Sequence, residues 1–180
     1  MLKTTNSKVV TGKARFSYCN VWEPKSIEGS IPKYSVSLII PKSDTKIISD
    51  IKAAIENAKK DGISKFGGKI PANLKQPLRD GDIDRPDDAA YANCYFLNAN
   101  STTKPGVVDK NVNPILDQSE LYSGCYGRAS ISFYAFNQNG NRGIACGLQN
   151  LQKLSDGDAL GGKARAEDDF STADDEDFLA

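Results

Sequence analysis

The 180-residue sequence contains no histidine, and this absence excludes several kinds of active site. Histidine is the side chain whose unperturbed pKa lies nearest neutral pH, so the usual general base is missing. Ser-His-Asp triads, Cys-His pairs and histidine-ligated metal sites are excluded with it. We therefore expect a protein that is not an enzyme, with no catalytic residue, no metal site and no cofactor.

Cysteines and long apolar runs are also scarce. Cys19, Cys94, Cys125 and Cys146 are far apart in the sequence, so no CxxC pair of the zinc-ribbon kind is present. Buried free thiols in a reducing compartment are the simpler expectation. No segment approaches the roughly 20 apolar residues of a membrane span, and residues 1–10 lack the apolar core of a signal peptide. These features predict a cytoplasmic protein with no membrane partner.

The net charge is zero, because 23 Lys and Arg balance 23 Asp and Glu, but the charges are segregated. Seven acids and no base lie in residues 167–180, so residues 1–166 carry 23 bases and 16 acids. This pattern is typical of a basic body with an anionic partner and a competing acidic arm. A solvated tail that only keeps a protein soluble is the commoner origin of such acidic runs. We expect one folded domain at 1–155 and a flexible acidic tail at 156–180.

Alternating apolar and polar residues predict strands at 13–22, 33–40, 91–100, 124–137 and 142–151. In the first strand Ala14, Phe16 and Tyr18 are expected to share one face, and Pro24 is expected to end it. The dipeptide Asn139-Gly140 predicts a hairpin between the last two strands.

One strong helix is predicted after the second strand, with Ser43 or Asp44 as its N-cap and Gly62 at its end. Residues 62–90 show no sustained period and predict an excursion from the core. Five strands and one helix are typical of a small, mainly β barrel.

The strand at 124–137 has a distinctive second face, formed by Tyr126, Arg128, Tyr134 and Phe136. If this face is exposed, its rings offer stacking platforms to unpaired bases and its guanidinium offers a charge to phosphates. If the helix or the 62–90 segment covers it, the same aromatics belong to the core. The sequence alone leaves both interpretations open.

Other basic, polar and aromatic residues lie near predicted strand ends, and with that face they complete a candidate single-strand interface. Trp22 is either a core residue or part of a clamp. The candidate DNA contacts are Arg15, Trp22, Lys25, Lys33, Asn98, Asn100, Lys104, Tyr126, Arg128, Tyr134 and Phe136.

A second function class rests on the carboxylates Asp80, Asp82 and Asp84. Residues 80–91 resemble the start of a calcium loop, but Arg85 stands where that loop needs glycine and Tyr91 where it needs glutamate. An acidic turn is the better interpretation, although such a cluster could bind magnesium in a nuclease. A metal-dependent nuclease is therefore an alternative to a binding protein.

Several blocks of the sequence resemble one known family. They are residues 33–42, 77–82, 95–101, 104–109, 123–129, 133–137 and 143–148. The block Ser-Gly-Cys-Tyr-Gly-Arg-Ala at 123–129 is the most specific of them. The sequence is similar, over most of residues 8–170, to phage and prophage proteins once grouped as a domain of unknown function and now regarded as single-stranded DNA-binding proteins.

The resemblance implies an OB-fold barrel that coats and protects single-stranded DNA in phage or prophage replication, recombination and repair, in the cytoplasm of a bacterial host. It also implies an acidic tail that competes with DNA and docks a polymerase, helicase or primase, and a homodimer is possible. The tail residues that fit this role are Asp174, Asp175, Glu176, Asp177 and Phe178. Leu179 and Ala180 follow the phenylalanine, so the chain does not end on the aromatic residue. A replication adaptor that binds DNA weakly is the alternative.

Overall fold

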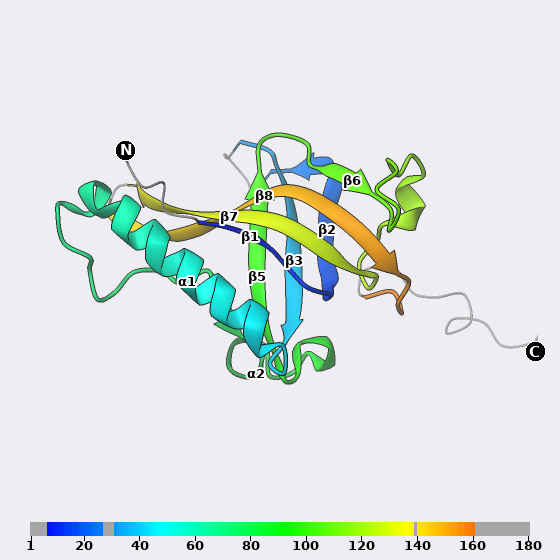
Figure 1. Ribbon diagram of the computed structural model, residues 1–180, viewed down its shortest axis with the longest axis horizontal. Helices are drawn as coiled ribbons and strands as arrows, with labels where there is room; N and C mark the ends of the chain where they lie inside the picture. The colour runs from blue at the N-terminus through cyan, green and yellow to red at the C-terminus, as the bar shows by residue number, and fades with distance from the viewer. Residues whose placement is uncertain (1–6, 27–30, 139, 161–180) are drawn as a thin grey trace, which may run out of the picture.

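The computed structural model describes residues 7–26, 31–138 and 140–160 (Figure 1). Its strands are β1 (Lys8–Val10), β2 (Ala14–Lys25), β3 (Lys33–Pro41), β4 (Leu78–Asp80), β5 (Cys94–Ser101), β6 (Gly106–Val108), β7 (Tyr126–Gln138) and β8 (Asn141–Ser155). Its helices are α1 (Thr45–Asp61) and α2 (Gly81–Asp84), with single 3-10 turns at η1 (Ile63–Phe66), η2 (Ala89–Tyr91) and η3 (Gln118–Glu120).

Five strands close into a ring in the order β2–β3–β5–β8–β7, and β7 pairs back to β2. Neighbours in the ring run antiparallel except β5 and β8, which pair in parallel through Ala99 and Cys146. The short strands β1, β4 and β6 extend the sheet beside β7, β5 and β8. The predicted five-stranded barrel is therefore confirmed, and α1 follows the second ring strand as expected.

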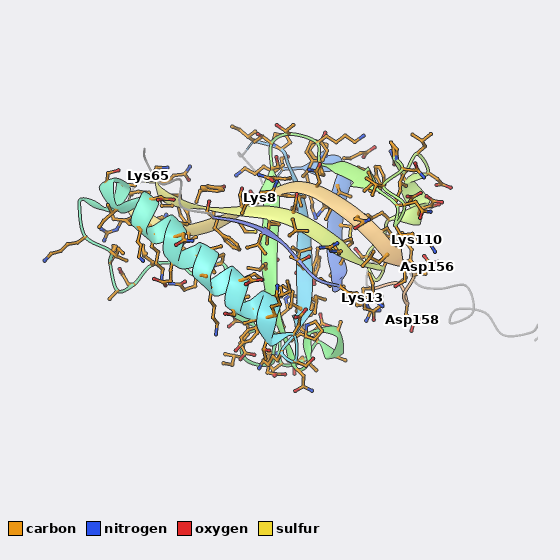
Figure 2. The ribbon with its side chains drawn as sticks, viewed as in Figure 1. Lys8, Lys13, Lys65, Lys110, Asp156 and Asp158 are labelled. Atoms are coloured by element: carbon orange, nitrogen blue, oxygen red, sulfur yellow. The ribbon has the colours of Figure 1, made fainter. Side chains whose placement is uncertain are left out.

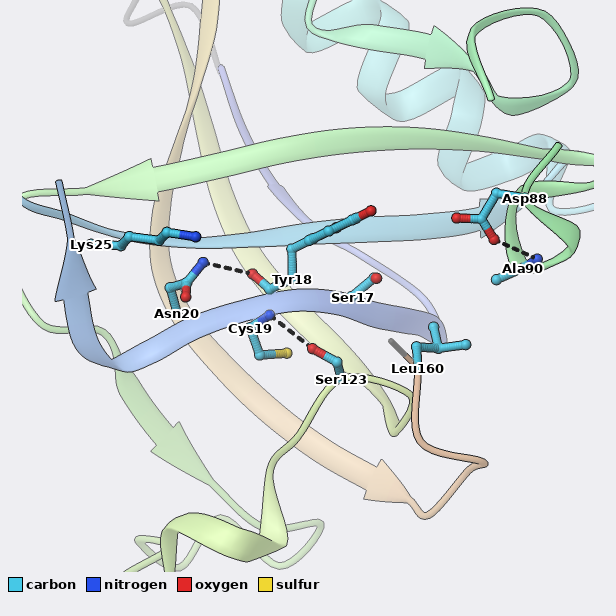
Figure 3. A pocket seen from close by; sticks show the side chains of 9 residues that line it. All are labelled: Ser17, Tyr18, Cys19, Asn20, Lys25, Asp88, Ala90, Ser123 and Leu160. Carbon is cyan, nitrogen blue, oxygen red and sulfur yellow. Dashed lines mark hydrogen bonds between the residues drawn. The ribbon is translucent and has the colours of Figure 1, made fainter. Parts of the chain in front are cut away.

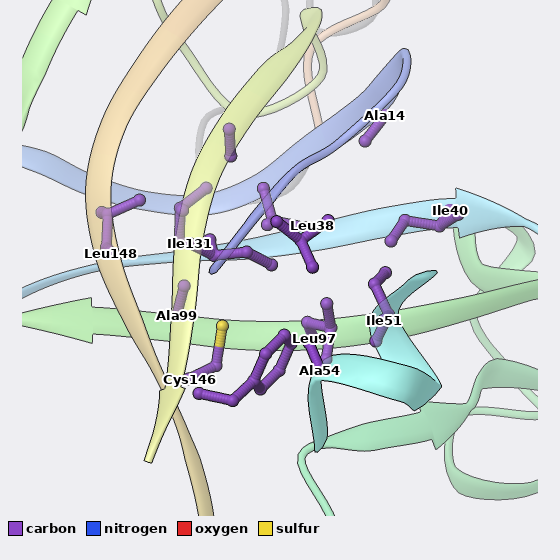
Figure 4. Packing of buried hydrophobic residues seen from close by; sticks show 14 of the residues in the cluster. Ala14, Leu38, Ile40, Ile51, Ala54, Leu97, Ala99, Ile131, Cys146 and Leu148 are labelled. Carbon is purple, nitrogen blue, oxygen red and sulfur yellow. The ribbon is translucent and has the colours of Figure 1, made fainter. Parts of the chain in front are cut away.

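The barrel is filled by the inward side chains of the ring strands and closed on one side by α1. Phe16, Leu38, Leu97 and Ile131 are fully buried there. Ile51 of α1 points into the same cluster (Figure 4). Because Ile51 belongs to this cluster, the helix and the barrel share one core. Burying an aliphatic or aromatic side chain of this size contributes about 1.5–3 kcal/mol.

Both ends of α1 are where the sequence predicts them. The Asp44 side chain accepts a hydrogen bond from the Ile47 amide, which makes it the N-cap. At the other end the Gly62 amide donates to the Ala58 carbonyl oxygen. A Cβ atom on Gly62 would collide with Ala135 of β7, so glycine lets the helix end against the barrel wall.

Strand β2 departs from the predicted alternation at Tyr18. Its φ angle is 48°, in the left-handed region, and the pairing with β3 shifts register between Ser17 and Asn20. This bulge moves Val21 into the core, where it is fully buried, and leaves Tyr18 54% exposed. The expectation that Tyr18 shares the buried face of Phe16 is wrong for this reason. Strand β2 also continues past Pro24 to Lys25, so Pro24 does not end it.

Strand β7 keeps a strict alternation along its length. Gly127, Ala129, Ile131, Phe133 and Ala135 are buried, while the residues between them are half-buried or exposed. The candidate aromatics of this strand therefore point away from the core. Its hairpin to β8 is confirmed by the pairing of Gln138 with Asn141.

The excursion at 62–90 is packed on the barrel. Lys75 exchanges backbone hydrogen bonds with residues 142 and 144 of β8, and β4 pairs with β5. Tyr91, predicted to begin a strand, closes η2 instead, and β5 begins at Cys94. No helix in the described part of the chain is long and apolar enough to span a membrane.

Candidate nucleic-acid interface

A strip of small polar residues crosses the outside of the barrel. Asn20, Ser35, Asn100, Gly147 and Ser132 are successive partners on β2, β3, β5, β8 and β7. The Asn20 amide nitrogen lies 3.4 Å from the Ser35 hydroxyl, which joins the first two strands of the strip. Because neighbouring residues on each strand point inward, these side chains are left outside. The result is a polar path that crosses every strand of the ring.

A second polar row lies beside the first. Ser17, Ser37 and Asn98 are successive partners on β2, β3 and β5, and Asn98 is exposed. The Ser37 hydroxyl lies 3.0 Å from the Tyr91 hydroxyl, so η2 is tied to this row. Two of the sequence-predicted contacts, Asn98 and Asn100, therefore lie on the outer polar surface of β5.

One end of the strip opens into a hollow of about 410 Å³ (Figure 3). Its lining residues are Ser17, Tyr18, Cys19, Asn20, Lys25, Asp88, Ala90, Ser123 and Leu160. Tyr18 stands out from β2 across the hollow, and Lys25 lies at its far side. The predicted contact Lys25 thus lines the same hollow as the exposed ring of Tyr18, which the alternation had placed on one face with Phe16.

Arg85, in the 62–90 excursion, contacts Tyr18 and Asp88, two residues that line this hollow. Its guanidinium carbon lies 4.9 Å from the ring centroid of Tyr18 and 4.8 Å from that of Tyr91. Its Nη1 donates a 2.9 Å hydrogen bond to the Tyr18 hydroxyl and lies 3.7 Å from an Asp88 carboxylate oxygen. The hydrogen bond with Tyr18 raises the pKa of Arg85 above its ordinary value.

A second hollow, of about 310 Å³, lies at the other end of the strip. Lys33, Asn100 and Tyr134 line it together with Gly147 and other residues of β5, β7 and β8. The Tyr134 side chain is 44% exposed, and partial burial raises the pKa of its hydroxyl. Three predicted contacts from three different strands therefore meet at this site.

Arg15 and Tyr126 form a separate pair where the chain leaves the barrel. The Arg15 guanidinium carbon lies 5.5 Å from the Tyr126 ring centroid, and Lys13 Nζ lies 4.9 Å from it. Arg15 Nη2 also donates to the Asp158 carbonyl oxygen at 2.7 Å. Lys13 and Asp158 lie at one end of the molecule and Lys65 at the other (Figure 2). Residues up to Leu160 are thus fixed to the barrel before the rest of the chain begins.

The remaining predicted contacts lie away from the strip. The Trp22 indole is half-buried, donates to the Leu121 carbonyl oxygen at 3.1 Å and has Lys104 Nζ 5.8 Å from its centroid. Arg128 Nε donates to the Thr11 carbonyl oxygen at 2.9 Å, farther along β7 from Ser132 and Tyr134. Phe136 shares a shallow hollow with Lys65 and Tyr134. The predicted tail residues 174–178 lie outside the described residues.

Two of the carboxylates considered for a nuclease, Asp80 and Asp82, share a structural partner. Lys42 Nζ lies 2.8 Å from an oxygen of Asp80 and 2.8 Å from an oxygen of Asp82. The hydrogen bond from Lys42 lowers the pKa of Asp82. The four cysteines are free thiols, and burial raises the pKa of Cys19 to about 12. Within the described ranges, no group of three or more acidic or cysteine side chains is placed to hold a metal ion.

Solved structures of phage proteins share this fold. A single-stranded DNA-binding protein from bacteriophage Enc34 in complex with single-stranded DNA is 26% identical, with a TM-score of 0.78 over 86% of this chain and 90% of that one. The same phage protein in another structure gives 24% identity and a TM-score of 0.73, over 92% and 90% of the two chains. The gp2.5 single-stranded DNA-binding protein of bacteriophage T7 is 16% identical, with a TM-score of 0.60 over 90% and 91%. The expected OB-type barrel is confirmed.

Sequence comparisons agree with the structural ones. The chain is 36% identical to "Putative protein p50" of Acyrthosiphon pisum secondary endosymbiont phage 1, over 96% of this chain and 99% of that protein. The family model described as "Enterobacter phage Enc34, ssDNA-binding protein" matches residues 7–179. Proteins of this kind bind DNA and catalyse no reaction, so the prediction of a protein that is not an enzyme is confirmed. The chain belongs to the phage single-stranded DNA-binding protein family typified by that of Enterobacter phage Enc34.

Proposed function

We propose that this protein coats single-stranded DNA along the polar strip, with bases stacked on Tyr18 and Tyr134 at its two ends. The observation that carries the proposal is that an exposed tyrosine lies at each end, Tyr18 at one and Tyr134 at the other. Lys25 and Lys33, which are paired across β2 and β3, each line one of the two hollows. Base–aromatic stacking contributes about 1–3 kcal/mol per base and tolerates any sequence. The polar side chains between the tyrosines leave room for a sugar-phosphate backbone.

The other predicted contacts extend this path in the proposal. Arg15 and Tyr126 form a charged, aromatic surface where the chain leaves the barrel, and Lys104 covers Trp22 near the ends of β2 and β5. Arg128 and Phe136 lie farther from the strip and are the outermost of the proposed contacts. The excess of bases over acids in residues 1–166 attracts the phosphate backbone.

The biological setting that we propose is phage or prophage DNA replication, recombination and repair in the host cytoplasm. The family relationship and the fold shared with T7 gp2.5 support a phage role. Homodimer formation is part of the proposal and is measured by the mass of the protein in solution.

The acidic tail is proposed to compete with DNA and to dock a polymerase, helicase or primase. Leu160 packs against the cluster of Ile39, Tyr91 and Phe96 and lines the Tyr18 hollow, so the tail starts beside the proposed interface. A tethered polyanion has an effective concentration of order millimolar at a nearby site. Phe178 supplies an apolar anchor among the acids.

The DNA-binding proposal is tested by fluorescence anisotropy with labelled oligothymidine and with a duplex of equal length. We expect tighter binding to the single strand, weakened by Lys25→Ala and by Lys33→Ala. The slope of log K against log salt should fall by about 0.7 for each lysine that no longer binds a phosphate. Lys46→Ala is the matched control, because Lys46 is 86% exposed on α1. Equal affinity for the two DNA forms would refute the proposal.

The tail proposal is tested with a chain lacking residues 167–180 and with a full-length chain whose seven tail acids are changed to amides. Both should bind single strands more tightly at low salt, where charges are least screened. Phe178→Ala should keep the competition and lose the replication partner in a pull-down. Unchanged affinity in both tail variants at low salt would show that the tail does not compete.

A further inference from the structure

Arg85 contacts three aromatic rings on the outer face of the barrel. Besides Tyr18 and Tyr91, its guanidinium carbon lies 5.9 Å from the Phe96 centroid. Tyr91 and Phe96 pack edge to face with centroids 5.0 Å apart, and Tyr91 is almost fully buried. Two of the three rings thus form a fixed base under the guanidinium, and the third ring, Tyr18, is the exposed one.

Tyr18 is a residue that needs support. A non-glycine residue at a positive φ stores on the order of 1 kcal/mol or more of strain, and about half of this side chain is exposed. The Asn20 side chain holds the backbone through a 3.2 Å hydrogen bond to the Tyr18 carbonyl oxygen. Arg85 holds the ring, through the hydroxyl at one edge and through one face.

We propose that Arg85 is a positioning residue that fixes the Tyr18 ring across the hollow, so that a single unpaired base stacks on the free ring face. This inference rests on the proposed function. With one face covered by the guanidinium, Tyr18 offers the other face to one base. A base inside a duplex has both faces stacked already, so this arrangement favours single strands over duplex DNA.

This positioning role depends on the planar shape of the guanidinium as well as on its charge. Arginine stacks flat on aromatic rings while its fixed N–H groups donate at the edge, whereas a lysine ammonium is a compact point charge. The Arg85 guanidinium is also already paired with the Asp88 carboxylate and hydrogen-bonded to the Tyr18 hydroxyl. Arg85→Lys should therefore bind single-stranded DNA more weakly than the unchanged protein, although it keeps the charge.

The test measures oligothymidine and duplex affinity for Arg85→Met, Arg85→Lys, Tyr18→Phe and the double variant Tyr18→Phe with Arg85→Met. We expect both Arg85 variants to bind the single strand about threefold to tenfold more weakly, with an unchanged salt slope and unchanged duplex affinity. The weakening in the double variant should be smaller than the product of the two single effects, because Tyr18→Phe has already removed the hydroxyl that Arg85 holds. Melting temperatures measured on the same samples check that each variant is folded.

Several results would overturn the inference. If Arg85→Met reduces the salt slope by about 0.7, both alone and combined with Tyr18→Phe, then Arg85 binds a phosphate directly. Unchanged single-strand affinity in Arg85→Lys would also overturn it. So would an equal weakening of single-strand and duplex binding in Arg85→Met. Tyr18→Phe leaves the packing of Arg85 on Tyr91 and Phe96 in place, so it tests the inference even if Arg85→Met is unstable. Tyr18→Ala separates the two proposals, because unchanged affinity in that variant would instead refute stacking on Tyr18.

Discussion

Tyr134 and Phe133 are neighbours on β7 that point to opposite sides of the barrel wall, and exchanging each for a smaller residue should separate affinity from stability. Tyr134 is 44% exposed and Phe133 is 2% exposed. Truncating a fully buried Phe to Ala costs about 3–5 kcal/mol. Since little more than half of Tyr134 is buried, we expect Tyr134→Ala to cost roughly half of that or less in unfolding free energy.

The expected effects on binding are the reverse. Loss of one stacked base is worth about 1–3 kcal/mol, so the oligothymidine Kd of Tyr134→Ala should rise about 5- to 150-fold. Phe133→Leu should lower the melting temperature and leave the Kd of the folded protein unchanged. Anisotropy titrations and thermal melts of the two variants in one buffer measure both quantities.

A wild-type Kd in Tyr134→Ala would refute the reasoning for this end of the strip. Stacking would then be confined to the Tyr18 hollow, and the β7 face would be removed from the interface. A large drop in the Tyr134→Ala melting temperature would show that the Tyr134 ring is needed for packing and stabilises the fold.

Three further predictions concern stability and reactivity. Because folding lowers the pKa of Asp82, its ionised carboxylate stabilises the fold at pH values above its ordinary pKa of 3.8. This contribution is lost as the pH falls through the lower pKa of the folded state. Lys42→Met should therefore melt lower at neutral pH and lose less on acidification, in melts from pH 7 to about pH 2. Burial raises the pKa of Cys19 to about 12, so alkylation at about pH 8 should be much slower in the native than in the denatured protein. Gly127→Ala places a Cβ against the Gln152 carbonyl oxygen and 2.7 Å from the Phe16 ring, and should destabilise the protein by about 1–3 kcal/mol in denaturant titrations.

The outward face of β7 could be predicted because its alternation runs unbroken through the strand. Periodicity of two residues is a direct consequence of strand geometry, so a long regular run fixes which side chains share a face. Whether that face was covered could not be predicted, because covering depends on where α1 and the 62–90 excursion pack. The structure shows Tyr134 uncovered.

Tyr18 was assigned to the wrong face although the sequence holds a sign of the bulge. Continuing the alternation from Ala14 and Phe16 would bury the polar Asn20 and expose Val21. A change of phase between Phe16 and Val21 corrects both, and a bulge is the means by which a strand changes phase. The residue at the change is the one that leaves the core.

Arg85 could not have been found in this way. It lies in a segment with no period, and its partner Tyr18 is 67 residues earlier in the chain. The contact depends on the placement of α2 and η2 over β5, which hydrogen bonds such as that between Ser37 and Tyr91 determine. Local pattern carries no information about a contact of that range.

The core and the proposed interface therefore use the same strands but different side chains, and this separation bears on how the family diverges. Inward positions must fill one barrel, so the fold persists at 26% identity with a TM-score of 0.78. The outward residues Ile39 and Phe96 pack with Tyr91 in a second buried cluster, whereas the strip residues Asn20, Ser35 and Asn100 belong to neither core cluster. Tyr18, an exposed residue of the proposed interface, has a positive φ and accepts a hydrogen bond from Arg85 of a distant segment. The bulge at Tyr18 buries Val21 and exposes the Tyr18 ring, and in our proposal the first base stacks on that ring.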